Sequence, residues 1–186
     1  IAKGIDVPNV TLSVVIAAGG LLHRPDISAE EKSLQLFLQL AGRAGRAQKK
    51  GKVIFQTYKP SHPVISYLQK RDYEKFLIES SKLRKDANLF PFCRVCLLKL
   101  SGENYALTEL IANKVAKYLQ DFCDKKKWKL IGPAPSLIAK VGKKFRWQIL
   151  IHGPENSKIP LPNTSLLWKL VPKNVFLTID TNPAEL

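Results

Sequence analysis

Hydrophobic and polar positions in the first third of the chain follow two different periods. The run VTLSVVIAA (10–18) is short, rich in β-branched residues and bounded by Pro and Gly, which is typical of a buried strand in a parallel sheet. The segment 27–47 repeats apolar residues at helical spacing, and Ser28 followed by Glu31 matches a capping box at its start. Because GKVIFQTY (51–58) is predicted to be a second strand, the order strand, helix, strand indicates an α/β unit.

The pattern changes in the rest of the chain. Residues 61–90 predict a helical connector that ends at Pro91, because proline cannot continue a helix. Beyond it, the strands FCRVCLLKLSG, KWKLIGPAP, KFRWQILIHG and VFLTID and the helices NYALTELIANKVAKYLQDFC and NTSLLWKLV follow in the order β-α-β-β-α-β. That order is typical of a split βαβ sandwich. We therefore expect an α/β segment over 1–60 and a small α+β domain over 91–186.

The chain is strongly basic. Its 186 residues include 30 Lys and Arg against 15 Asp and Glu, for a net charge of +15. The excess is spread along the chain, which favours a polyanionic partner such as nucleic acid over a merely soluble surface. No apolar run reaches the 18–20 or so residues of a transmembrane helix, and no signal peptide is visible. The chain has no Met and starts at Ile1, so we expect a C-terminal fragment of a longer protein.

Three cysteines, Cys93, Cys96 and Cys123, bear on compartment and metal binding. An odd number without secretory context is typical of a reducing cytoplasm. FCRVC has C-x-x-C spacing, but positions three apart in a strand face opposite sides of a sheet. No second Cys or His pair follows at zinc-site spacing. We expect core cysteines and no metal site in this chain.

The segment QLAGRAGRA (39–47) brings polar side chains to one helical stripe. At about 100° per residue, Arg43 falls about 40° and Arg46 about 20° from Gln39. Gly42 and Gly45 lower helix propensity and allow a close backbone approach. Two guanidinium groups converging at a bare surface suit a phosphate, and the alternative is a solvated basic helix face.

A second cluster interleaves cations and aromatics in VGKKFRWQ (141–148). Its candidates for DNA or partner contact are Lys143, Lys144, Arg146, Trp147 and Gln148. In a strand, positions 144, 146 and 148 share one face and the two aromatics lie on the other. Phosphate contact with base stacking is the functional interpretation. The alternative places the aromatics in the core and the cations in solvent.

Two motifs carry a resemblance to a known family. Q-x-x-G-R-x-G-R resembles motif VI of superfamily 2 helicases, and KGIDVPNV (3–10) is similar to motif V, G-x-D-x-P. Together with AGRAGRAQKKGKVIFQTYKPSHP, LFPF, IGPAP and FRWQILI, essentially the whole chain resembles the primosomal protein N′ family, the PriA-type replication-restart helicases. The resemblance implies that Arg43 and Arg46 act as arginine fingers on ATP, beside Gln39. It also implies that Gly4 and Asp6 couple nucleotide to nucleic acid.

The resemblance implies an ATP-dependent 3′→5′ DNA helicase that restarts replication at stalled or branched forks by primosome assembly. Residues 1–60 would then end a RecA-like lobe, and 91–186 would bind fork DNA, single-stranded DNA, single-strand DNA-binding protein and other primosome proteins in the bacterial cytoplasm, near the nucleoid, with no role at a membrane. Its cofactors would be ATP with Mg²⁺, and zinc for the full-length family. Because this chain contains no P-loop and no zinc segment, we expect neither hydrolysis by it alone nor bound zinc.

A rival hypothesis is a truncated or degenerate module that binds fork DNA and single-strand DNA-binding protein without hydrolysing ATP. AAGG (17–20) favours it, because the family usually carries acidic residues there. The intact set of Gln39, Arg43 and Arg46 favours the helicase instead.

Overall fold

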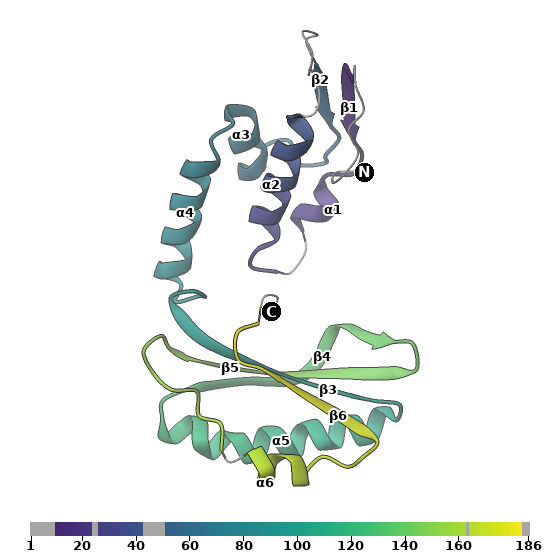
Figure 1. Cartoon of the computed structure of the whole chain (residues 1–186), viewed down its shortest axis with the longest axis vertical. Coiled ribbons are helices and arrows are strands. Elements are labelled where there is room, and N and C mark those ends of the chain that lie inside the picture. Colours follow the sequence, from purple (N-terminus) through teal and green to yellow (C-terminus); the bar gives the residue numbers. More distant parts are fainter. Residues whose placement is uncertain (1–9, 24–25, 43–50, 163, 184–186) are drawn as a thin grey trace. The chain divides into compact units, whose positions relative to one another are not determined.

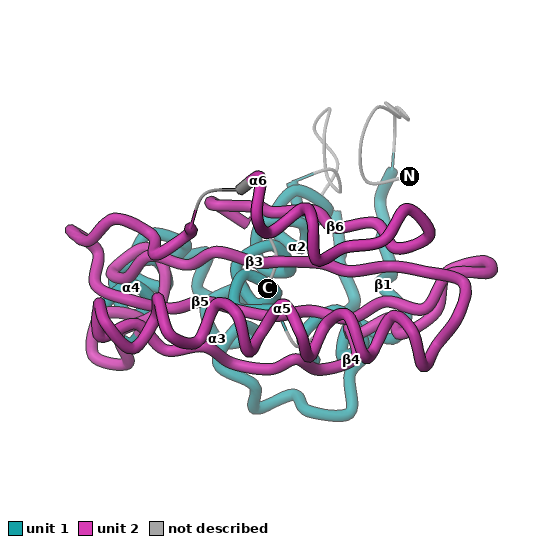
Figure 2. Tube along the Cα trace, turned by 90° about the horizontal axis from the view of Figure 1, so that it is seen from below, with its two compact units in different colours: residues 1–83, 185 teal, residues 84–184, 186 magenta. Residues whose placement is uncertain are grey.

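The computed structural model describes residues 10–23, 26–42, 51–162 and 164–183. The chain divides into two compact units between Leu83 and Arg84 (Figure 2). The first unit contains β1 (Leu12–Val15), α1 (Gly19–Leu22), α2 (Ala29–Ala41), β2 (Lys52–Phe55), α3 (Pro63–Lys70) and most of α4 (Tyr73–Asp86), as labelled in Figure 1. The second contains β3 (Cys93–Gly102), α5 (Tyr105–Lys125), β4 (Lys129–Val141), β5 (Lys144–Pro154), α6 (Thr164–Lys169) and β6 (Val175–Asp180).

The first unit contains the predicted strand, helix and strand. β1 and β2 pair in parallel, from Leu12 opposite Lys52 to Val15 opposite Phe55, and α2 lies between them in sequence. Leu34 and Phe37 are fully buried on one face of α2, as the helical spacing predicts. The structure therefore confirms mixed α/β structure here. The RecA-like assignment stays a prediction, because two strands do not define that fold.

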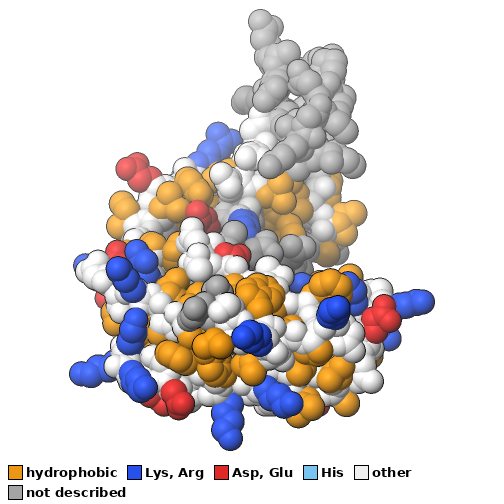
Figure 3. Space-filling model, turned by 60° about the horizontal axis from the view of Figure 1, so that its bottom comes forward, with side chains coloured by type: hydrophobic (Ala, Val, Ile, Leu, Met, Phe, Trp, Pro, Cys, Tyr) orange, Lys and Arg blue, Asp and Glu red, His pale blue; other side chains and the backbone are white. Residues whose placement is uncertain are grey.

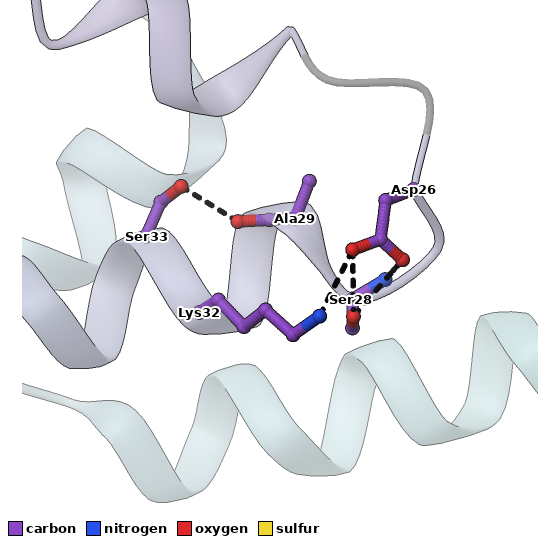
Figure 4. A network of polar contacts seen from close by, with 5 residues as sticks. All are labelled: Asp26, Ser28, Ala29, Lys32 and Ser33. Carbon is purple, nitrogen blue, oxygen red and sulfur yellow. Dashed lines mark hydrogen bonds and ion pairs between the residues drawn. The ribbon is translucent and has the colours of Figure 1, made fainter. Parts of the chain in front are cut away.

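The start of α2 differs from the predicted capping box. Ser28 occupies the N-cap position but makes no side-chain capping hydrogen bond. Its N–H and hydroxyl both donate to the Asp26 carboxylate at 3.0 Å, and Lys32 Nζ lies 3.0 Å from the same group (Figure 4). A carboxylate two residues upstream is the stronger acceptor and closes an Asx turn. The Ser28 hydroxyl is thereby drawn away from the helix amides.

The predicted connector, 61–90, is helical but belongs largely to the first unit. α3 starts at Pro63 and is capped by His62, whose Nδ1 accepts a hydrogen bond from the Val64 N–H at 3.3 Å. Val64 and Leu68 of α3 are buried in the same core as Phe37. These helical residues therefore contribute to the core of the first unit.

The second unit has the predicted order of elements and a split βαβ topology. Its sheet has the strand order β4-β5-β3-β6, and all neighbouring strands are antiparallel. α5 joins β3 to β4 while β5 lies between them, and α6 joins β5 to β6 across β3. Each helix thus connects two strands that are separated by a third, which is the arrangement predicted for this part of the chain.

Both helices of the second unit cover the same face of the sheet (Figure 1). Asn104 caps α5 by accepting a hydrogen bond from the Leu107 N–H at 2.9 Å. The core between helices and sheet contains Leu98, Leu100, Ile111, Val115, Leu119, Ile149, Ile151, Leu167 and Leu177. Each such side chain contributes about 1.5–3 kcal/mol when fully buried. Among the described residues, no helix of this unit lies on the opposite face, where Val95 and Leu97 of β3 are nevertheless buried. In the described part of the chain, no helix is long and apolar enough to cross a membrane.

Candidate nucleic-acid interface

The sheet face opposite α5 and α6, here called the open sheet face, receives the polar side chains of β5. Trp147, Ile149 and Ile151 point into the helix-covered core. Since side chains alternate along a strand, Lys144, Arg146 and Gln148 lie on the open sheet face. The predicted sharing of one face by these three residues is therefore confirmed by the structure.

Strand register brings side chains of three strands together on this face. Arg146 pairs with Ser101 of β3, which pairs in turn with Phe176 of β6. Gln148 pairs with Lys99, which pairs with Thr178. Directly opposite residues have Cβ atoms about 4.5–5.5 Å apart. The open sheet face thus contains two cross-strand rows of three residues each.

Positive charge is uncompensated along these two rows. Lys99 and Arg146 are half-buried, and neither takes part in the ion pairs found among the described residues. Neither row contains an acidic residue; Asp180 stands one row further on, opposite Leu97. Lys144 Nζ lies 3.9 Å from the centroid of the Phe176 ring, a cation–π contact. A surface with several cations and no acidic partner attracts a polyanion.

Trp147 of β5 belongs to the helix-covered core and has to be removed from the candidate contacts. Trp147 is only 6% exposed, and its ring lies 5.8 Å from that of Tyr105 in α5. Phe145 also meets Tyr105, edge to face at 5.4 Å. A base cannot stack on a ring whose faces are covered by the protein's own side chains. The alternative that places the aromatics in the core therefore holds for Trp147.

Two residues of the open sheet face were missed by the sequence analysis. Phe176 is 55% exposed on β6, while its neighbours Val175 and Leu177 are buried. Lys99 interrupts the otherwise apolar run of β3. The two-residue alternation of β6 and β3 already assigns Phe176 and Lys99 to the face opposite the core, so the sequence contains the signal for both residues. Their meeting with Arg146 depends on strand pairing, which alternation alone does not give.

The remaining candidate residues fall into two groups. Lys143 is exposed in the turn between β4 and β5, beside Gly142 with φ +59°. Gln39 is exposed on α2, consistent with a polar stripe on that helix. The other candidates of motifs V and VI, Gly4, Asp6, Arg43 and Arg46, lie outside the described residues. Their convergence stays a prediction.

All three cysteines are buried free thiols, as predicted. Burial, with smaller contributions from Asp180 and Cys123, raises the pKa of the Cys96 thiol to about 11. Metal ligation requires the thiolate, which this environment disfavours. Within the described ranges, no group of three or more His, Cys, Asp or Glu residues is arranged to hold a metal ion.

Basic side chains are not confined to the open sheet face. Figure 3, which brings the lower side of Figure 1 forward, has Lys and Arg side chains scattered among apolar and neutral ones. Net charge therefore does not locate a binding site by itself. What distinguishes the open sheet face is the grouping of its cations by strand register.

Comparison with known proteins identifies the family of this chain. The profile of the Primosomal protein N C-terminal domain matches residues 85–183, which coincide closely with the second unit. Replication restart protein PriA of Bacillus subtilis is 37% identical over 191 residues and covers 98% of this chain. The protein of the same name is 33% identical in Synechocystis and 34% identical in Haemophilus influenzae, with 100% of this chain covered in both cases. The chain spans only 22–26% of the length of these three relatives. It belongs to the PriA (primosomal protein N′) family and corresponds to a C-terminal portion of such a protein.

Proposed function

We propose that this chain forms the C-terminal part of an ATP-dependent 3′→5′ DNA helicase that restarts replication at stalled or branched forks. Its curated relatives are named replication restart proteins, which supports a role in that process. The observation that carries the DNA-binding part of the proposal is the open sheet face, where Lys99 and Arg146 lie in two adjacent cross-strand rows that contain no acidic residue, and Lys144 follows on the same face of β5. Cations placed in this way neutralise phosphates and release their counterions.

The two units would have different roles, ATP chemistry in the first and DNA contact in the second. In the first, Arg43 and Arg46 would stabilise charge on the γ-phosphate of Mg²⁺-bound ATP, with Gln39 on the same stripe. Gly4 and Asp6 would link that site to nucleic acid. In the second, Lys144, Arg146 and Gln148 would contact DNA, with Lys143 near the strand turn. Single-strand DNA-binding protein and other primosome proteins would be the protein partners, and zinc would be bound outside this chain.

One structural feature favours a second candidate function, a non-catalytic module that binds fork DNA and its binding proteins. AAGG (17–20) begins two residues after the end of β1, near the strand end where α/β proteins place catalytic and binding groups. Ala17 and Ala18 carry only methyl groups at this position, so neither supplies a carboxylate, and Ala18 is fully buried. Fork-stimulated ATP hydrolysis by the intact restart protein separates the two candidates: hydrolysis that Arg43→Ala abolishes favours the helicase, and absence of hydrolysis favours the module.

The DNA-binding proposal is tested by fluorescence anisotropy with a labelled fork at several salt concentrations. We expect the Lys144→Ala, Arg146→Ala double variant to bind at least about tenfold more weakly at low salt. The slope of log K against log salt should fall by about two, because each lost phosphate contact removes about one.

A matched control removes two cations from the other side of the second unit. Lys114 and Lys117 are exposed on α5, whose buried face packs on the sheet. The Lys114→Ala, Lys117→Ala double variant has the same net charge as the test variant and should bind the fork like the unmodified chain. Equal losses in the two double variants would show that net charge, and not the open sheet face, governs binding.

A further inference from the structure

The open sheet face presents an aromatic ring that a purely electrostatic role does not require. Phe176 is 55% exposed although it lies in a regular strand whose alternate residues, Val175 and Leu177, are in the core. Exposing a phenyl ring to water is unfavourable, by roughly 25 cal/mol per Å² of apolar surface. The ring also lies among cations: Lys144 Nζ is 3.9 Å from its centroid, and Arg146 is in the same cross-strand row.

We infer that the open sheet face binds single-stranded DNA, with one base stacked on Phe176 and the adjoining phosphates held by Lys144 and Arg146. The inference rests on the proposed function and specifies which form of DNA this surface takes. Aromatic rings alternating with cations on an accessible surface are the two elements of single-strand binding, since every base has a π-face and every nucleotide has a phosphate.

The shape of the surface favours a single strand over a duplex. Phe176 stands on a sheet, not on a protruding loop, and only an unstacked base can lie flat on its ring. Its cross-strand neighbour Ser101 is small, which leaves space above the sheet next to the ring. Four strands about 4.8 Å apart make a platform about 14 Å wide, wide enough for a few nucleotides. In duplex DNA the base faces are covered by neighbouring bases.

The second row supplies groups that could contact base edges. Gln148, Lys99 and Thr178 stand side by side across three strands and offer an amide, an ammonium and a hydroxyl group. Ala134 of β4 continues this row beyond Gln148 without adding charge or bulk. The next row contains Asp180, whose carboxylate would repel phosphate. The charge pattern therefore favours binding of the single-stranded DNA across the two rows that begin at Phe176 and Thr178.

Stacking and charge make separable contributions to binding at this site. A base that covers the Phe176 ring would take the place of the Lys144 ammonium and free it for a phosphate. Removing the aromatic ring should weaken binding without changing its salt dependence, because no phosphate contact is lost. Removing Lys144 or Arg146 should lower the salt slope by about one each.

The test uses the complete chain, a labelled oligothymidylate and a duplex of equal length, with anisotropy measured at several salt concentrations. Phe176→Leu keeps an apolar side chain in β6 but removes the ring. We expect this variant to bind oligothymidylate about tenfold more weakly, with an unchanged salt slope and unchanged duplex binding. Phe176→Trp should retain binding, and the new indole fluorescence should be quenched by the oligonucleotide.

The matched control is Trp168→Leu, which removes a 47% exposed aromatic side chain from α6 on the helix-covered side of the sheet. Oligothymidylate binding should be unchanged. If Phe176→Leu binds as tightly as the unmodified chain while the Lys144→Ala, Arg146→Ala variant still loses affinity, the stacking inference is overturned and the proposed DNA contact stands. If the unmodified chain binds neither the oligonucleotide nor a fork, the stacking inference and the proposed DNA contact are both wrong.

Discussion

Asp26 illustrates how much one charged side chain does at the start of a helix. Its carboxylate accepts from the N–H and hydroxyl of Ser28 and pairs with Lys32, all at 3.0 Å. Burial alone would raise the pKa of this carboxyl, but the hydrogen bonds from Ser28 and the charge of Lys32 outweigh burial and lower the pKa below its ordinary 3.8. A lowered pKa in the folded state means that the ionised form stabilises the fold.

We therefore expect Asp26→Asn to lower the stability of the α2 region by about 1 kcal/mol at pH 7, the usual size of a lost helix-start interaction. The ionised carboxylate stabilises above pH 3.8, and this contribution is lost as the pH falls through the lower folded-state pKa. The variant and the unmodified chain should thus differ at pH 7 and converge in strong acid. Hydrogen exchange of the α2 amides, compared at equal pH, measures this. A difference that persists undiminished in strong acid would rule out the charged form as the cause.

At the scale of elements, the contact between β5 and the residue preceding β4 depends on a glycine. A Cβ added to Gly153 would lie 2.2 Å from Cδ2 of Trp128, far inside van der Waals contact. Trp128 is 3% exposed, and its Nε1 donates to the Ser157 hydroxyl at 3.0 Å. The indole therefore cannot move without losing both packing and a hydrogen bond. Trp128 is thus a structural residue within the basic segment 124–129, DKKKWK.

Gly153→Ala should consequently destabilise the second unit by about 2 kcal/mol, the typical cost of overpacking a core. The three tryptophans, at positions 128, 147 and 168, all lie in that unit, so urea unfolding followed by tryptophan fluorescence reports on it selectively. Gly20→Ala is the control, because nothing lies within 4 Å of the added Cβ and the residue is in the first unit. An unfolding midpoint for Gly153→Ala equal to that of the control would contradict the close approach.

At the scale of the whole molecule, the two units differ in how far their sheets are completed. The described part of the first unit has one two-stranded parallel sheet, and Leu12, Val14 and Ile54 on it are 53%, 52% and 42% exposed. Parallel sheets are normally covered on both faces. The second unit has four strands and a continuous core on its helix side. The second unit should therefore be the more stable.

We expect hydrogen-exchange protection in this chain to be clearly lower in β1 and β2 than in β3 and β5, since local stability follows burial and the completeness of the hydrogen-bonded sheet. Mass spectrometry after proteolysis resolves the two regions in a single experiment. Equal protection of the four strands would refute the expected difference.

Much of the local structure is determined by the sequence itself. The 3.6-residue period fixes α2 and α5, the two-residue period fixes the strands of the second unit, and their order predicts the split βαβ topology. The same alternation places Lys144, Arg146 and Gln148 on one face. These features follow from residues close together in the chain, because helical and pleated periodicities are local properties.

Other features are decided only by the tertiary structure. Which strands pair, and in which register, determines that Phe176 and Lys99 join Arg146, although these residues are far apart in sequence. Packing of α5 on one side of the sheet determines that Trp147 is buried while Phe176 on the other side is exposed. Pattern along the chain assigns each side chain to one of two faces. Only the long-range packing decides which face is covered, and therefore which residues can meet a ligand.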